Sequence, residues 1–145
     1  MSQTAYQDLG RLMVTVCRLH HTRADQSVEN LGLFRGQAFL LLTLADSEGM
    51  THSEIAERLR VSPAAVTKVI KRMEESDYVQ RQPDPADERV SRVYLQPAGR
   101  SLIAEIHRAF ASVNRATFEG LEETDLEQLR RLLTHMQESL RQFRP

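Results

Sequence analysis

Basic residues gather in the middle third of this 145-residue chain. Residues 58–100 hold nine Lys/Arg against six Asp/Glu, a net charge of +3, whereas the segments before and after them carry net charges of −3 and −1. A cationic patch on one face attracts phosphate even when the total charge is −1, so this segment predicts contact with nucleic acid. The residues expected to touch double-stranded DNA are Ser62, Ala64, Ala65, Thr67, Lys68, Lys71, Arg72, Arg81, Asp87, Arg89 and Arg92.

Most of these residues lie on one predicted helix, which starts at Ser62 and ends near Ser76-Asp77. Serine is a good N-cap, and Pro63 suits the first helical position because its missing N–H needs no partner there. The small residues Ala64 and Ala65, which follow Pro63, let the backbone approach a major groove about 12 Å wide. Thr67 and the basic side chains then reach base edges and phosphates. The alternative is an ordinary solvated helix face.

A β-hairpin is predicted directly after this helix. Its strands are expected at residues 78–81 and 90–95, and the proline-containing loop between them at residues 83–87. Arg89 near the tip can enter the minor groove, with Asp87 holding its guanidinium in a bidentate ion pair. The alternative for this pair is a surface salt bridge of little energetic weight. Arg81 and Arg92 are as readily solvated strand residues as phosphate contacts.

Further helices position these two elements. The segment Thr51-His52-Ser53-Glu54 has the spacing of a capping box, so a helix begins at Thr51 and reaches the turn Arg60-Val61. Together with the helix from Ser62 it makes a helix-turn-helix unit. The remaining helices are expected at 4–29, at 34–45 as an apolar helix buried nearly all round, at 97–119 and from about 122 to 143. Cys17, the single cysteine, is expected to be a small buried core thiol.

The fold class is therefore mainly α with a small β-hairpin wing (α+β), in one compact domain. Residues 33–97 form the winged helix-turn-helix DNA-binding region, and residues 1–32 and 98–145 form a helical dimerisation region. Apolar residues along the last helix follow an unbroken heptad pattern, and another apolar stripe runs along the first. These stripes predict an obligate homodimer, with an interface at Leu9, Leu12, Val16, Leu126, Leu129, Leu133, Met136, Leu140 and Phe143.

Residues 51–99 resemble the core of the MarR family of winged helix-turn-helix regulators. The family's wing pattern, D-x-R followed by a short strand and L-T-x-x-G, stands here as Asp87-Glu88-Arg89, Val93-Tyr94-Leu95 and Gln96-Pro97-Ala98-Gly99. The stretch Val61 to Glu74 is similar to the family's recognition helix. Three positions depart from the pattern: Asp77 replaces glycine, Glu88 is acidic where many members are basic, and Gln96 replaces threonine. Asp77 tolerates the left-handed conformation that the turn needs.

The resemblance implies a transcriptional regulator, most often a repressor, that a small-molecule ligand releases from a pseudo-palindromic operator. It also implies a ligand pocket near Cys17, His20, His21, Phe34 and Arg35. Two alternatives remain: a redox-sensing regulator acting through Cys17, and a winged-helix module that binds another protein. The scattered histidines lack the spacing of a metal site.

Other function classes find no support in the residues. We see no nucleophile-and-base constellation, no glycine-rich phosphate loop and no metal-ligand cluster, so neither an enzyme nor a cofactor is expected. No apolar run approaches the roughly 20 residues that span a bilayer, and residues 1–10 lack the pattern of a signal peptide. Without a membrane segment or disulfide framework, the expected location is the cytoplasm. The sequence does not identify the operator, the regulated genes or the effector.

Overall fold

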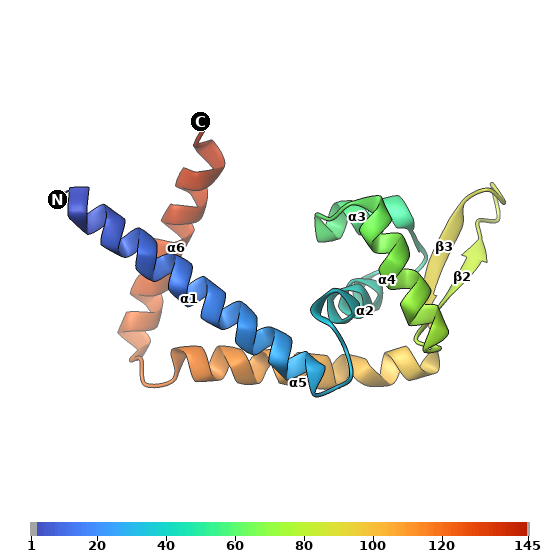
Figure 1. The fold of residues 1–145 in the computed structure, drawn as a ribbon, viewed down its shortest axis with the longest axis horizontal. Helices are drawn as coiled ribbons and strands as arrows, with labels where there is room; N and C mark the ends of the chain where they lie inside the picture. Colours follow the sequence, from blue (N-terminus) through green and yellow to red (C-terminus); the bar gives the residue numbers. More distant parts are fainter. Residues whose placement is uncertain (1–2, 145) are drawn as a thin grey trace. The chain divides into compact units, whose positions relative to one another are not determined.

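The computed structural model describes residues 3–144, and the chain divides into two compact units, 1–113 and 114–145. The first unit holds most of the secondary structure, and the second holds the end of α5 and all of α6 (Figure 1). The elements in chain order are α1 (Gln3–Glu29), α2 (Arg35–Asp46), β1 (Met50–Thr51), α3 (His52–Leu59), α4 (Pro63–Glu75), β2 (Val79–Pro83), β3 (Ser91–Leu95), α5 (Pro97–Phe118) and α6 (Glu123–Gln142).

The helix-turn-helix forms through the local signals that the sequence carries. Thr51 caps α3: its hydroxyl accepts from the Glu54 amide at 3.2 Å, and the Glu54 carboxylate accepts from the Thr51 amide at 2.7 Å. Ser62 caps α4 in the same way, accepting from the Ala65 amide at 3.2 Å. Between them Arg60 takes the left-handed conformation, with φ of 55°. The predicted capping box and N-cap are both confirmed.

The wing is a three-stranded antiparallel sheet in the order β1-β3-β2. The prediction missed β1, because a two-residue strand has no periodicity to detect. It was also wrong about Pro83, which was expected in the loop and is the last residue of β2, paired with Ser91. Proline is tolerated there because β2 is an edge strand, where no neighbour needs its missing N–H. Asp77, in the turn before β2, has φ of 56°, as expected for a residue that replaces glycine.

The core of the first unit lies between α2, α3, α4, β3 and α5. Its largest fully buried side chains include Leu40, Leu41, Ile70, Met73 and Ile106. The prediction that α2 is buried nearly all round is wrong. The helix packs against α1, α3, α4 and β3, but Gly36, Phe39, Ala45 and Asp46 are exposed. Phe39 is 42 % exposed and stacks on Phe110 of α5, with the ring centroids 5.5 Å apart.

Helices α1 and α6 bury little in a single chain. On α1 the buried residues are Ala24 and Val28, near its end. No residue of α6 is buried, and Phe143 lies just beyond its last turn. Apolar side chains along both helices therefore remain in contact with water. Within residues 3–144, no helix combines the length and apolar character needed to cross a membrane.

Candidate nucleic-acid interface

Helix α4 has one buried face and one cationic face. Val66, Ile70 and Met73 are buried in the core, which fixes the rotation of the helix. The opposite side consequently projects the predicted contact residues to solvent. Exposed on it are Ser62, Ala64, Thr67, Lys68, Lys71 and Arg72, whereas Ala65 is half-buried.

Across residues 3–144, the cations of α4 have no ion-pair partner. Lys68, Lys71 and Arg72 make no ion pair with any other residue that the structure describes. Arg60, in the turn before α4, is likewise exposed and unpaired within residues 3–144. Sequence reasoning placed Arg60 in the turn but did not count it as a contact. Its signal was a basic residue in the turn, two residues before the N-cap Ser62 of α4.

The wing tip contains the predicted Asp87–Arg89 ion pair. The Arg89 Nε and Nη2 atoms donate to the two Asp87 carboxylate oxygens, each at 3.0 Å. This pairing holds the pKa of Asp87 below its usual value and raises that of Arg89. The Arg89 side chain is 89 % exposed, so its Nη1 group remains open to a partner. The carboxylate orients the guanidinium without enclosing it.

Arg92 makes its contacts within the protein instead. Its Nε donates to Asp84, and its Nη1 donates to the Gly49 carbonyl at 2.7 Å. Asp84 is only 8 % exposed and also accepts from the Ala86 and Asp87 amides at 2.7 and 3.2 Å. The hydrogen bond from Arg92 is the main cause of the lowered pKa of Asp84. Arg92 thus joins the hairpin loop to the turn before β1.

Arg81 is also held within the protein. Its Nε donates to Glu74 Oε1 at 2.9 Å, and its Nη2 lies 2.7 Å from Glu74 Oε2. The Arg81 amide reaches the same carboxylate at 3.3 Å. Glu74 is on α4 and Arg81 is on β2, so the pair ties the helix to the wing beside it (Figure 1).

The structure places one residue of the expected ligand pocket, Arg35, at a cavity. A cavity of about 500 Å³ lies between α2, α3 and α4, and of the five predicted residues only Arg35 lines it. Arg35 also pairs with Asp25 of α1 at 3.2 Å. The expectation of a buried thiol is wrong, because Cys17 lies on the open part of α1 and is exposed. His20 and His21 are neighbours on the same helix, with ring centroids 6.5 Å apart in an edge-on arrangement.

A helix-turn-helix with a free cationic recognition helix and a braced hairpin beside it defines the class of winged-helix DNA-binding proteins. The MarR family model matches residues 33–91. The transcriptional regulator ZitR of Lactococcus lactis is 32 % identical over 125 residues, which cover 84 % of each chain. The chain therefore belongs to the MarR family and is a DNA-binding transcriptional regulator.

Solved structures agree with this assignment. The BpsR protein of Bordetella bronchiseptica is 26 % identical, with a TM-score of 0.75 over 88 % of this chain and 91 % of that one. A mutant of the MarR protein of E. coli, solved in complex with operator DNA, shares the fold at 22 % identity, with a TM-score of 0.76 over 89 % and 93 % of the two chains. The relatives named in these comparisons are regulators rather than enzymes.

Proposed function

We propose that this protein is a homodimeric repressor that binds a pseudo-palindromic operator and that a small organic molecule releases from it. The DNA contact is supported by a difference among the basic side chains, because some form ion pairs within the protein and others do not. Among the described residues, the cations of α4 form no ion pair, and Arg89 pairs with Asp87 but stays exposed. Arg81 and Arg92 are held by Glu74 and Asp84, and we call these two ion pairs the braces of the wing. In this proposal α4 enters the major groove and Arg89 enters the minor groove, while the two braces hold the wing in place.

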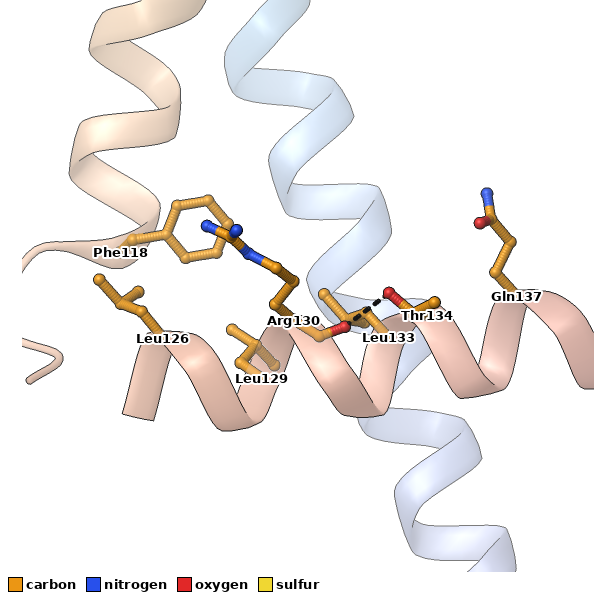
Figure 2. A pocket seen from close by; sticks show the side chains of 7 residues that line it. All are labelled: Phe118, Leu126, Leu129, Arg130, Leu133, Thr134 and Gln137. Atoms are coloured by element: carbon orange, nitrogen blue, oxygen red, sulfur yellow. Dashed lines mark hydrogen bonds between the residues drawn. The ribbon is translucent and has the colours of Figure 1, made fainter. Parts of the chain in front are cut away.

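Dimerisation is supported by the apolar surfaces of α1 and α6. Leu9 and Leu12 on α1 are 58 % and 59 % exposed, and Leu133 on α6 is 49 % exposed. In the second unit an apolar hollow of about 420 Å³ lies between the end of α5 and α6, where Phe118 is beside Leu126 and Leu129 (Figure 2). A second copy that covers these surfaces would remove them from water at about 25 cal/mol per Å². Two recognition helices would then meet half-sites about 10 base pairs apart.

The cavity between α2, α3 and α4 supports response to a small molecule. Its walls are mainly apolar, and two arginines, Arg35 and Arg58, line it. Ala65 and Val69 of α4 also line it, so an occupant would press directly on the recognition helix. An apolar organic acid matches this lining, and BpsR is a relative whose DNA binding is regulated by an organic acid, 6-hydroxynicotinic acid. Redox release through the exposed Cys17 is the alternative, and unchanged peroxide sensitivity in Cys17→Ser would remove it.

The test of the DNA contact compares two wing arginines. Arg89→Ala should weaken binding to a selected operator by about tenfold per half-site, because a charged contact is lost, and should leave the melting temperature unchanged. Arg92→Ala should instead lower the melting temperature by several degrees, because it removes hydrogen bonds inside the protein. Fluorescence anisotropy and circular dichroism measure the two effects. Equal operator affinity of Arg89→Ala and the parent would refute the minor-groove role.

Salt dependence separates DNA binding from the remaining alternative, a protein-interaction module. Each phosphate that a cation neutralises contributes about −0.9 to the slope of log affinity against log salt concentration. Lys68→Ala and Lys71→Ala should each make that slope shallower. A protein that shows no salt-dependent affinity for any duplex would instead use this surface for another protein.

A further inference from the structure

His52 and Thr67 make a contact between the two helices of the helix-turn-helix that the sequence did not reveal. The ring Nδ1 of His52, the first residue of α3, lies 3.5 Å from the hydroxyl oxygen of Thr67 on α4. The same hydroxyl donates to the Pro63 carbonyl, one turn earlier on α4, at 3.0 Å. The Thr67 hydroxyl is thus held on two sides by the protein.

The protons of this contact can be assigned. A hydroxyl has one proton, and Thr67 gives it to Pro63, so toward His52 the hydroxyl can only accept. A hydrogen bond from His52 to this hydroxyl requires the tautomer with the proton on Nδ1. Its Nε2 atom is buried without a hydrogen-bond partner among the described residues, where a second N–H would find no acceptor.

The surroundings of His52 keep the ring neutral. Burial is the main cause of its lowered pKa, the charge of Arg81 on β2 lowers the pKa further, and Glu74 on α4 opposes both. The neutral ring can therefore keep donating from Nδ1 to Thr67.

From this geometry we infer that Thr67 reads a thymine in the operator through its γ-methyl group, with His52 as the positioning residue. The inference rests on the proposed function, because it requires α4 in the major groove. With the hydroxyl held on two sides, the methyl is the part of the side chain left for a partner. Thymine alone presents a methyl group on the major-groove edge of a base pair, and threonine methyls make apolar contacts with it.

The neighbours of Thr67 fit this interpretation. Ala64 lies three residues earlier, on the same face of α4, and is exposed, so it places a second methyl beside the first. Lys68 and Lys71 are exposed and, among the described residues, unpaired on the same helix, where they supply phosphate contacts. The apolar pair would read the base, and the lysines would hold the register of the helix on the duplex.

The experiment uses a duplex that the full-length protein selects from a randomised pool. Each thymine of a half-site is then replaced by uracil, symmetrically in both halves, which removes only the 5-methyl group. At one position the parent should lose about fourfold in affinity per half-site, the factor for burying one methyl-sized group, and about fifteenfold in total. A pool without enrichment would overturn sequence-specific binding itself, whereas enriched duplexes that tolerate uracil at every thymine would overturn the methyl contact alone.

Matched variants assign the effect to the two residues. Thr67→Ser keeps the hydroxyl and removes the methyl, so it should lose most of the discrimination between the thymine and uracil duplexes, and any remainder would come from Ala64. Thr67→Val keeps a methyl but loses the hydroxyl that His52 and the Pro63 carbonyl hold, so it should discriminate more than Thr67→Ser and less than the parent. If Thr67→Ser discriminates as well as the parent, another side chain reads the thymine.

The role of His52 is tested by the same ratio. His52→Asn retains an N–H donor near the Nδ1 position and should preserve discrimination, whereas His52→Leu removes the donor and should reduce it. A merely structural role would lower the affinity for both duplexes alike and leave their ratio unchanged, which would refute positioning by His52.

Discussion

Gly99, in the first turn of α5, occupies a position where the structure leaves no room for a side chain. A Cβ atom built there would lie 2.2 Å from the Tyr78 carbonyl oxygen and 3.2 Å from Leu41 Cδ2. A carbon–oxygen contact normally needs more than about 3 Å, so Gly99→Ala creates an overlap of about 1 Å. The Tyr78 carbonyl cannot retreat freely, because it accepts a hydrogen bond from the Gln96 amide at 2.9 Å.

The cost of the substitution follows from these contacts. One extra methyl in a packed site costs about 1–3 kcal/mol, and the wall here is backbone, which places the cost near the upper end. Alanine recovers up to about 1 kcal/mol of helix propensity. We therefore expect Gly99→Ala to lower the free energy of unfolding by about 2 kcal/mol, and the melting temperature by about 6 °C.

The control is the same substitution at Gly36 of α2. A Cβ atom there would meet Val69 Cγ2 at 3.7 Å, an ordinary contact. Gly36→Ala should therefore leave stability unchanged or raise it by up to about 1 kcal/mol. Chemical denaturation followed by circular dichroism measures both variants. If Gly99→Ala is as stable as the parent, α5 can shift away from the turn before β2, and the close approach of α5 to Tyr78 is not a fixed feature of the fold.

Two further predictions concern assembly and pH. Leu133→Asp should convert the dimer into a monomer in light scattering, because a carboxylate would lie in the apolar surface of α6. Operator binding should be abolished together with the dimer. A stable monomer of the parent at micromolar concentration would contradict the dimer. Because the pKa of His52 is lowered in the folded protein, the unfolded chain takes up a proton more readily, so the free energy of unfolding should fall as the pH drops below about 6.5. The pKa values of the paired carboxylates Glu48 and Asp84 are also lowered. Their protonation should reduce the free energy of unfolding further, but only below about pH 4.5. His52→Asn should flatten the upper part of this profile, and an unchanged profile would place the titrating group elsewhere.

Local signals made the fold and the wing tip predictable. The capping box at Thr51 and the N-cap at Ser62 each join residues three apart, so the sequence itself holds both partners. The Asp87–Arg89 ion pair spans two residues and was predicted for the same reason. Apolar periodicity then located the helices to within a few residues. Interactions that begin and end within one turn or one loop depend little on the rest of the fold.

The roles of the other wing arginines could not be predicted, because their partners lie on other elements, from seven to 43 residues away. Arg92 meets the Gly49 carbonyl 43 residues away, and His52 meets Thr67 15 residues away. Such contacts depend on the register of β1 against β3 and on the packing of α3 on α4, and neither can be read from periodicity. The missed strand β1 and the missed role of His52 therefore have one cause.

In the proposed complex, the ion pairs within the protein determine which basic side chains are available to DNA. A count of basic residues treats Arg81, Arg89 and Arg92 as equals, yet Glu74 and Asp84 hold the first and last inside the protein. Within residues 58–100, all of which the structure describes, the basic residues without an ion pair are Arg60 and the three of α4. In the proposed complex, pairing within the protein thus leaves the binding charge mainly on α4, whereas Arg81 and Arg92 hold the wing beside it. Removing a brace should therefore weaken operator binding by displacing the wing, whereas removing a free lysine should weaken it by losing a phosphate contact. Loss of a lysine contact should also reduce the dependence of affinity on salt, because fewer counterions are then released.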